Sequence, residues 1–210
     1  MSKKINQVEA LEKILSLLET ETTRVLIGVV GKPGSGKSTF TKYLKNKSDP
    51  RVVSVVPMDG FHLSNSVLTQ LQRSDRKGAP DTFDVYGFIS LLKRIRMGSE
   101  SAIYYPIFDR SIEESIAGQG VISPETRLVI VEGNYLLHNE GGWENVSELL
   151  DQIWILDLDE DKRISRLISR HIAFGKDPET AKAWAKGSDE ANAKVIEKGS
   201  HRADFIVTDG

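Results

Sequence analysis

The amino-acid sequence predicts an α/β protein of three layers, in which helices cover both faces of a mainly parallel sheet of five strands. Two observations lead to this prediction. Short apolar runs that are typical of buried strands alternate along the chain with segments of helical periodicity. A glycine-rich segment also joins one of these runs directly to a helical segment. The length of 210 residues fits one domain of this kind.

The first part of the chain supplies a helix, a strand, the glycine-rich loop and a second strand. Residues 5–19 form the predicted N-terminal helix, because apolar side chains recur there at helical spacing: Val8, Leu11, Ile14, Leu15 and Leu18. Val25–Val30 is apolar throughout, as expected of a strand covered on both faces. A helix near 37–45 and a strand at 52–56 follow.

The alternation continues to the end of the chain, with helical patterns at 85–97, 161–174 and 189–198 and strands at 128–131, 153–156 and 204–207. Two stretches fit the sheet poorly. In 98–124 we expect a small hairpin around 118–120. In 175–187, Asp177 followed by Pro178 is typical of a helix start, with the aspartate as N-cap and the proline as first helical residue.

Composition and charge exclude several classes of protein. The chain has 28 basic and 30 acidic residues and a net charge of −2, so no global positive field attracts nucleic acid or an anionic membrane. The sequence has no cysteine, which excludes disulfides, thiolate catalysis and cysteine-based zinc sites. The N-terminal residues lack an apolar stretch of signal-peptide length, and all apolar runs are far shorter than the roughly 18 residues of a spanning helix. We expect a cytoplasmic protein with no nucleic-acid or membrane partner.

The strongest motif is Gly31-Lys32-Pro33-Gly34-Ser35-Gly36-Lys37-Ser38, a complete G-x-x-x-x-G-K-[ST] pattern between a predicted strand and a predicted helix. In such a loop, backbone N–H groups point at phosphate oxygens, the lysine reaches the β- and γ-phosphates, and the serine hydroxyl binds magnesium. The helix N-terminus adds a favourable dipole. The motif predicts nucleotide binding by Gly31, Gly34, Ser35, Gly36, Lys37, Ser38 and Thr39.

A second candidate follows the strand at 52–56. Asp59 places a carboxylate at the carboxyl end of this strand, where it can orient an acceptor hydroxyl and take its proton during phosphoryl transfer. The alternative is that Asp59 only begins a turn with Gly60. His62 is open to two interpretations, substrate binding and simple packing.

Four segments together resemble the phosphoribulokinase, uridine kinase and bacterial pantothenate kinase superfamily of P-loop kinases. They are MDGFH at 58–62, RKGAPDTFD at 76–84, YPIFDR at 105–110 and VIVEGNYLL at 129–137. The likeness is greatest to a small bacterial branch of fructose-transport-system-kinase-like and pantothenate/uridine-kinase-like proteins. It implies a P-loop NTPase fold of the nucleoside-kinase type, with a single domain over 1–210 and a helical lid at about 160–187.

The resemblance also implies a reaction, the transfer of the γ-phosphate of ATP to a hydroxyl of a small molecule. In this comparison Asp59 is the general base, Lys37 is catalytic, and Glu132 joins Ser38 near magnesium. A carboxylate that follows an apolar strand suits this hard cation. The residues expected on the acceptor side are His62, Arg76, Lys77, Arg110 and Asn134, although without the resemblance the segment 76–84 would be interpreted as a charged surface loop.

Arg163, Arg166 and Arg170 fall at i, i+3 and i+7 of a helical pattern and predict one basic face. A guanidinium that a closing segment brings over ATP neutralises charge on the transferring phosphoryl group and helps to exclude water. In the superfamily a helix at this place begins a mobile lid with such arginines. We therefore expect Arg166 at the transferring group and Arg170 at the nucleotide. A merely solvated face is the alternative.

Two functions remain open at this point, and the net charge of −2 weighs mildly against a third, a kinase that acts on nucleic-acid ends. The favoured one is an ATP- and magnesium-dependent kinase for a sugar, pantothenate-like or nucleoside acceptor, with a sugar slightly preferred. The alternative is a nucleotide-dependent regulatory ATPase or switch without a small-molecule acceptor. The separate signals at Asp59, Glu132 and the lid arginines favour the kinase, because a switch needs no acceptor base. Since relatives are often dimers, a homodimer is a further expectation.

Overall fold

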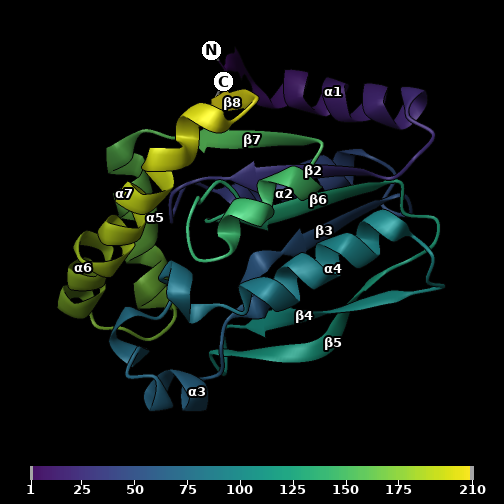
Figure 1. Cartoon of the computed structure of the whole chain (residues 1–210). Coiled ribbons are helices and arrows are strands. Elements are labelled where there is room, and N and C mark those ends of the chain that lie inside the picture. The colour runs from purple at the N-terminus through teal and green to yellow at the C-terminus, as the bar shows by residue number, and fades with distance from the viewer. Residues whose placement is uncertain (1, 209–210) are drawn as a thin grey trace.

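The computed structural model, which describes residues 2–208, is built around a six-stranded sheet with helices on both faces (Figure 1). The strand order is β1-β8-β7-β2-β6-β3, and every neighbouring pair runs parallel. This arrangement confirms the predicted α/β fold. The strands of the sheet are β1 Lys3–Ile5, β2 Val25–Val30, β3 Val53–Pro57, β6 Leu128–Gly133, β7 Gln152–Asp157 and β8 Phe205–Thr208.

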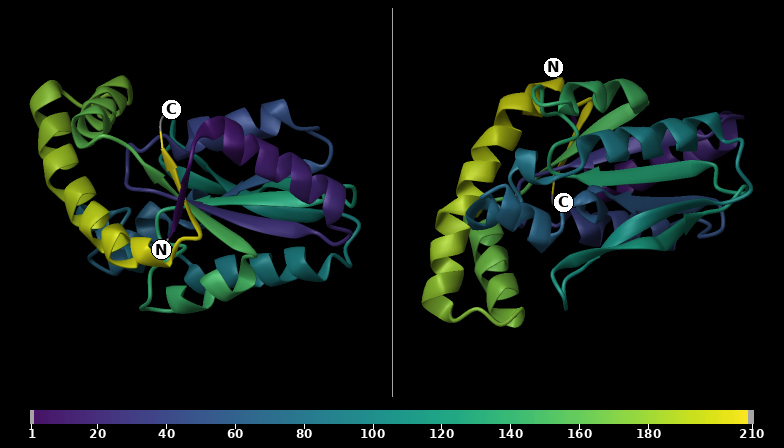
Figure 2. Two further views of the ribbon diagram at one scale, coloured as in Figure 1. Left: turned by 90° about the horizontal axis from the view of Figure 1, so that it is seen from above. Right: turned by 60° about the horizontal axis from the view of Figure 1, so that its bottom comes forward.

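Helices α1 and α2 pack on one face of the sheet, and α4 packs on the other. The view from above in Figure 2 shows α1 and α4 on opposite sides of the strands. The helices are α1 Gln7–Thr20, α2 Lys37–Lys47, α3 Asn65–Gln70, α4 Val85–Met97, α5 Glu160–Ala173, α6 Pro178–Lys186 and α7 Ser188–Gly199. Between residues 2 and 208, no helix is long and apolar enough to cross a membrane.

Strand β2 shows why an unbroken apolar run forms a central strand. All of its residues are buried. Leu26 and Val30 belong to the core built with α4, whereas Ile27 and Val29 belong to the core built with α1 and α2. Because successive side chains of a strand point to opposite faces, a strand that helices cover on both sides is apolar at every position.

The sheet has one strand more than the five predicted, because β1 pairs with β8 at the edge. The sequence predicts a helix from residue 5, but the side chain of Asn6 accepts hydrogen bonds from the backbone of Val8 and Glu9 and so starts α1 at Gln7. Ile5 is buried and pairs with Val207. A strand this short has too weak a pattern to be predicted when its partner lies at the other end of the chain.

An antiparallel hairpin stands beside β3, and its turn differs from the expected one. Its strands β4 Ile103–Asp109 and β5 Glu114–Ile122 are joined at 110–113, not around 118–120. Gly118, with φ of +70°, lies instead where the register of the pair shifts. The hydroxyl of Tyr105 donates a hydrogen bond of 2.9 Å to the carbonyl of Val55 and fixes the hairpin against β3.

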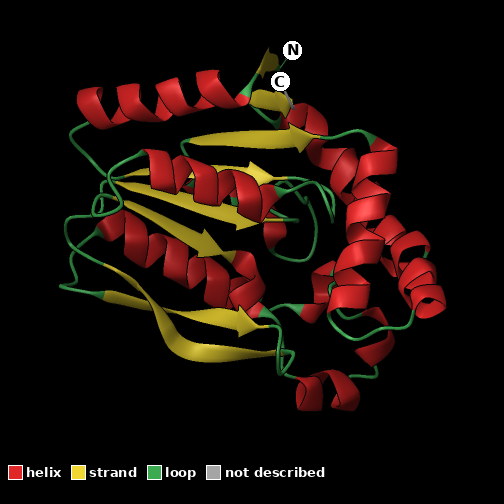
Figure 3. Cartoon of the chain, turned by 180° about the vertical axis from the view of Figure 1, so that it is seen from behind, coloured by secondary structure: helices red, strands yellow, loops and turns green. Residues whose placement is uncertain are grey.

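Helices α5, α6 and α7 stand at the carboxyl ends of the parallel strands (Figures 1 and 3). Asp177 caps α6 as predicted, because its side chain accepts a 3.0 Å hydrogen bond from the backbone N–H of Thr180, and Pro178 is the first helical residue. The segment expected as a lid, 160–187, is therefore occupied by α5 and α6. The loops that follow β2, β3 and β6 open toward these helices.

Candidate active site

The phosphate loop, residues 31–38, connects β2 to α2 in a conformation that depends on two glycines. Gly34 and Gly36 have φ values of +83° and +87°, in the left-handed region that residues with a Cβ atom rarely adopt. At Gly34 a Cβ atom would also lie 2.7 Å from Cγ of Leu167, because α5 packs directly against the loop. The loop is thus held in place by the first helix of the lid segment.

Lys37 is the first residue of α2 and directly follows Gly36. Its Nζ donates hydrogen bonds to the carbonyl oxygens of Gly31 at 2.7 Å and Lys32 at 3.3 Å. Burial lowers the pKa of Lys37 to about 8, although the nearby charges of Glu132 and Asp59 favour its protonated form. A phosphate is a stronger partner for an ammonium group than a neutral carbonyl, so Lys37 is available to a bound anion.

Glu132, near the end of β6, faces the first turn of α2. Its Oε1 accepts a 2.5 Å hydrogen bond from Oγ of Ser38, and its Oε2 accepts a 3.1 Å hydrogen bond from the hydroxyl of Thr41. Burial raises the pKa of Glu132, while the bond from Ser38 and the charge of Lys37 oppose this shift. Sequence reasoning missed Thr41, although its position one turn after Ser38 places both hydroxyls on one face of α2.

The oxygens of Ser38 and Glu132 suit a magnesium ion. This cation prefers hard oxygen ligands and binds through one or two carboxylates together with waters and substrate phosphates. In the part of the chain that the structure describes, no three His, Cys, Asp or Glu side chains cluster closely enough to hold a metal by themselves. A cation at Ser38 and Glu132 therefore needs further oxygens, which a phosphate in the adjoining loop would supply.

Asp59 lies in the 3-10 helix Met58–Phe61, directly after β3. Its Oδ2 accepts a 2.9 Å hydrogen bond from Nη2 of Arg110, which belongs to the turn of the β4–β5 hairpin. Gly60 permits this meeting, because any Cβ atom on it would collide with the carbonyl oxygen of Pro106 in β4. The structure thus brings the expected base and one expected substrate residue into direct contact.

The side chain of His62 packs against aromatic rings and also forms a hydrogen bond. Its ring lies between those of Phe83 and Phe108, at centroid distances of 4.0 and 4.7 Å. Nδ1 lies 2.8 Å from the carbonyl oxygen of Asp59. Because a carbonyl can only accept, Nδ1 carries the hydrogen and Nε2 is left as an acceptor. Burial lowers the pKa of His62, which favours this neutral form. Both interpretations of His62 are therefore compatible with its position.

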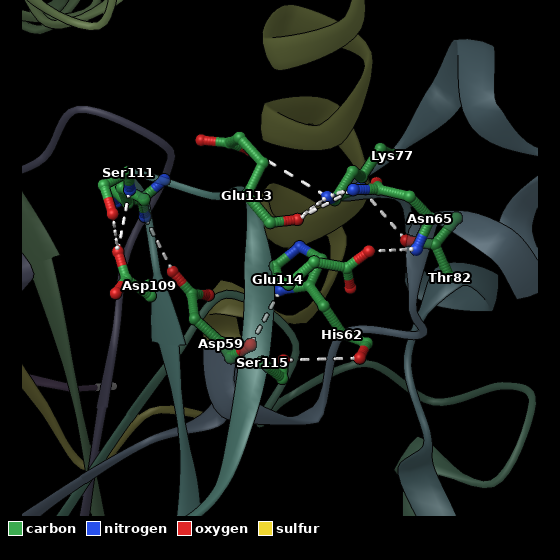
Figure 4. A network of polar contacts seen from close by, with 12 residues as sticks. Asp59, His62, Asn65, Lys77, Thr82, Asp109, Ser111, Glu113, Glu114 and Ser115 are labelled. Carbon is green, nitrogen blue, oxygen red and sulfur yellow. Dashed lines mark hydrogen bonds and ion pairs between the residues drawn. The ribbon is translucent and has the colours of Figure 1, made fainter.

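The loop after α3 contains two expected substrate residues. Lys77 lines the cleft, whereas Arg76 lies at the surface. The side chain of Lys77 is 17% exposed, and its Nζ donates to Oδ1 of Asn65 at 2.7 Å and to the carbonyl oxygen of Glu113 at 2.6 Å (Figure 4). Arg76 instead forms a 2.8 Å ion pair with Asp81 and does not line the cleft. Its position gives no support to a substrate role, because the local ion pair holds it at the surface.

The arginines of α5 do not form the single basic face that their spacing predicts. Arg163 is buried, donates a 3.1 Å hydrogen bond to the carbonyl of Pro33 in the phosphate loop, and forms ion pairs with Glu160 and with Glu190 of α7. Carboxylates from two elements therefore draw Arg163 into the interior. The helical periodicity of α5 could not predict that Arg163 is buried, because its partner Glu190 belongs to another helix, α7.

Arg166 and Arg170 remain directed toward the cleft. Nη1 of Arg166 lies 3.2 Å from the position that a Cβ atom would take on Gly36. Within residues 2–208 neither arginine has a carboxylate at ion-pair distance. Burial and the charge of Arg110 lower the pKa of Arg170. Two guanidinium groups that form no ion pair within the described residues thus line the cleft that contains the phosphate loop.

A cleft of about 620 Å³ gathers most of the expected residues. It is lined by Gly34, Gly36, Lys37, Ser38, Thr39, Asp59, His62, Lys77, Arg110, Glu132, Asn134, Arg166 and Arg170. A second cavity of about 420 Å³ borders the same loop at Lys32 and Ser35. It is lined by apolar side chains of β7, α7 and β8 together with the charged side chains of Glu160, Arg163 and Glu197. Sequence reasoning missed this cavity, because its walls come from segments that no motif connects.

Comparison with known proteins gives matches over most of the chain. A model of the family described as phosphoribulokinase / uridine kinase matches residues 26–210. A Schizosaccharomyces pombe protein, provisionally named a uridine kinase, is 32% identical over 194 residues, which cover 88% of this chain and 83% of the relative. The Escherichia coli protein YggC is 32% identical over 188 residues, which cover 88% of this chain and 77% of the relative.

A solved structure from Silicibacter sp. TM1040 resembles this one over almost its full length. That protein is provisionally named a fructose transport system kinase. The TM-score is 0.86 and the sequence identity 36%, with 96% of this chain and 98% of that chain covered.

Proposed function

The chain is a kinase of the phosphoribulokinase and uridine kinase family, and we propose that it transfers the γ-phosphate of ATP to a hydroxyl group of a small molecule, with Asp59 as general base. One observation carries this proposal. A single cleft contains Lys37 of the phosphate loop, the Ser38–Glu132 oxygen pair and the carboxylate of Asp59, each from the end of a different strand. A cleft with these groups can hold a phosphate donor and deprotonate an acceptor.

In the proposed reaction the acceptor oxygen forms a bond to the γ-phosphorus while the bond from this phosphorus to the β–γ bridging oxygen breaks, so that ADP leaves. Asp59 receives the hydroxyl proton. Lys37 offsets the negative charge of the β- and γ-phosphates, and Arg166 and Arg170 add positive charge from α5. Because no carboxylate of the described chain engages either arginine, both can turn to the phosphates.

Ser38 and Glu132 would hold a magnesium ion, which would offset the negative charge of the phosphates. The protein prepares this site through the hydrogen bonds that join Glu132 to Ser38 and Thr41. Thr41 orients the carboxylate of Glu132, because its hydroxyl donates to Oε2 while the hydroxyl of Ser38 donates to Oε1.

The second cavity suits the nucleobase of the donor. Ile155, Leu158 and Ile206 give it apolar walls that can contact a flat ring. Oγ of Ser35, at the border with the phosphate loop, is buried and has no hydrogen-bond partner among residues 2–208. A polar atom of the nucleotide can satisfy this hydroxyl, which supports placing the base and ribose here.

The acceptor proposed here is a small polyol, with a sugar preferred to a nucleoside or a pantothenate-like compound. Nε2 of His62 and the side-chain amide of Asn134 line the cleft and supply hydrogen-bonding groups for hydroxyls. The name of the Silicibacter relative supports the same choice.

The test is ADP release with magnesium and ATP across a panel of sugars, nucleosides and pantothenate, with Lys37→Ala as the blank. We expect one acceptor to raise ADP release well above the blank and to yield a phosphorylated product. Slow hydrolysis that no acceptor changes and that another macromolecule stimulates would contradict the proposal and favour a regulatory ATPase.

A further inference from the structure

Residues 78–84, which we call the cleft segment, run beside the short stretch that follows the proposed base. The backbone N–H of Leu63 donates to the carbonyl of Thr82 at 2.9 Å, and the backbone N–H of Asp84 donates to the carbonyl of Phe61 at 2.8 Å. These two bonds pair the segments as neighbouring antiparallel strands are paired. The position of the residues after the proposed base therefore depends on where the cleft segment lies.

The same pairing brings two rings together. The centroid of the His62 ring lies 4.0 Å from that of Phe83, a buried residue of the cleft segment. The ring of Phe83 in turn packs against Tyr135 and Trp143, with centroid distances of 5.8 Å to each. Because Nδ1 of His62 donates to the carbonyl of Asp59, a displacement of Phe83 reaches the proposed base through His62.

Two buried aromatic donors fix the cleft segment. The hydroxyl of Tyr135 donates to the carbonyl of Gly78 at 2.6 Å, and Nε1 of Trp143 donates to the carbonyl of Pro80 at 3.1 Å. The exposed fractions of Tyr135 and Trp143 are only 0% and 1%. A buried donor that loses its acceptor costs free energy, so both carbonyls are kept at these positions.

Thr82 stabilises the turn inside the cleft segment. Its hydroxyl donates to the carbonyl of Ala79 at 2.7 Å and accepts a 3.0 Å hydrogen bond from the backbone N–H of Gly78. Gly78 has a φ of +99°, which residues with a Cβ atom rarely adopt. The turn thus presents to Tyr135 a carbonyl whose direction is already fixed.

Tyr135 also connects the cleft segment to the metal side of the site. It lies three residues after Glu132, one of the two proposed magnesium ligands. Burial raises the pKa of Tyr135, so its hydroxyl keeps the proton that it donates. The end of β6 therefore contributes one side chain to the cation site and, three residues later, one to the support of the opposite wall of the cleft.

We propose that Tyr135 and Trp143 are positioning residues, which act on the proposed base through the cleft segment. Neither side chain lines the cleft, so neither is a catalytic residue. The proposal rests on the kinase function proposed above and adds two residues to it. A displacement of about 1 Å at the reacting groups can lower the rate by about 10²-fold, so the loss of one supporting bond is enough to reduce kcat.

Tyr135→Phe and Trp143→Phe remove the two donors and keep an aromatic ring at each position. The matched control is Trp154→Phe. Trp154 is also buried and its Nε1 donates to Oε1 of Gln152 at 3.0 Å, but it lies in the core on the other face of the sheet. The substrate is the most active compound of the panel of sugars, nucleosides and pantothenate.

We expect kcat to fall by about tenfold or more in Tyr135→Phe and in Trp143→Phe but not in Trp154→Phe. The Kd for ATP should be unchanged in all three variants, because the phosphate loop is intact in each. A loss of stability alone would affect the control as much as the other two variants.

The ring of His62 offers a readout that needs no acceptor. Burial lowers its pKa, and Phe83 covers one side of the ring. The charged groups that act on this ring are Asp59, Lys77 and Arg110, and all of them are present in every variant. A change of the pKa of His62 therefore reports a change in how its ring is packed.

NMR titration of the histidine ring signals measures this pKa, with His62→Gln to assign the signal among the four histidines of the chain. Tyr135→Phe and Trp143→Phe should raise the pKa by about 0.5 or more toward the ordinary value of about 6.5. Trp154→Phe should leave it at the wild-type value.

Two results overturn the proposal. One is a pKa of His62 in Tyr135→Phe and Trp143→Phe that equals the wild-type value. The other is a raised pKa with an unchanged kcat, because the displacement would then not matter to the reaction. Failure of the wild-type protein to use any compound of the panel contradicts the kinase function instead, and the titration still decides whether the two donors position His62.

Thr82→Val provides a second variant in case the aromatic substitutions prevent folding, which urea unfolding of each protein reveals. It keeps the size of the side chain and removes the hydroxyl that joins Gly78 to Ala79. We expect the same raised pKa of His62 and the same reduced kcat. Wild-type values of both in a folded Thr82→Val protein would contradict a role of the cleft segment in positioning the base.

Discussion

Nη2 of Arg110 lies 2.9 Å from Oδ2 of Asp59, although 51 residues separate the two side chains along the sequence. Asp59 follows a strand of the central sheet, and Arg110 belongs to the turn of the neighbouring hairpin. The position of the proposed base therefore depends on how the hairpin packs against β3.

We predict that Asp59→Asn lowers kcat by about 10²-fold or more, because a positioned general base contributes this much to proton transfer. The affinity for ATP should stay unchanged, since Asn keeps the size of Asp and the phosphate loop is intact. Steady-state kinetics and titration with a fluorescent ATP analogue measure the two quantities. Asp75→Asn, at an exposed position of the loop after α3, is the control. Normal turnover by Asp59→Asn would exclude Asp59 as the general base.

The pKa of Lys37 predicts a pH dependence of ATP affinity. Lys37 must be protonated to attract the phosphates, and burial lowers its pKa to about 8 in the free protein. Binding an anion favours the protonated form, so ATP affinity is fully present below this pKa and falls as the pH rises through it. We expect the Kd for ATP to increase above about pH 8, by up to about tenfold per pH unit.

Calorimetric titration in buffers from about pH 7 to pH 9.5 measures this dependence. Lys37→Met should bind ATP weakly and without the increase. A Kd of the wild-type protein that stays constant across the range would show that Lys37 does not titrate where its burial predicts.

The Ser38–Glu132 pair predicts a specific magnesium defect. Glu132→Gln keeps the size and can still hydrogen-bond Ser38 and Thr41, but it removes the negative charge that attracts the cation. We expect the magnesium concentration for half-maximal activity to rise by at least about tenfold, with partial recovery of kcat at high magnesium. Thr41→Val, which removes the hydrogen bonds of this hydroxyl to Oε2 of Glu132 and to the carbonyl of Ser38, should cause a smaller change. An unaltered magnesium requirement in Glu132→Gln would move the metal site elsewhere.

Arg163 predicts a link between the packing of helices α5 and α7 and ATP binding. Its buried guanidinium joins the carbonyl of Pro33 to Glu190 of α7, so Arg163→Met leaves the loop without this support. We expect the free energy of unfolding to fall by about 1–3 kcal/mol and the KM for ATP to rise more than kcat falls. Urea unfolding and steady-state kinetics check the two effects.

Arg163→Lys is the matched variant, because it keeps the charge but cannot bridge three partners with a planar group. It should retain more stability than Arg163→Met while still raising the KM for ATP. A loss of stability with an unchanged KM in both variants would show that Arg163 supports the fold and not the phosphate loop.

Several site residues could be predicted from sequence because they depend on short-range rules. The phosphate loop needs glycines at 34 and 36, where φ is positive, and it needs a strand before it and a helix after it. Asp59 and Glu132 follow or end apolar strands, and parallel strands bring their carboxyl ends to one edge. The cap of α6 at Asp177 is equally local.

Other features were decided by contacts between distant segments. The sequence by itself determined the α/β class, the phosphate loop and the carboxylates at the strand ends, because periodicity and turn chemistry act over a few residues. Only the tertiary structure decided that Arg163 is buried while Arg166 faces the cleft, and that Arg110 reaches Asp59. The direction of a long charged side chain depends on which carboxylate lies nearest after folding, and the carboxylate that pairs with Arg110 comes from a segment remote in the chain.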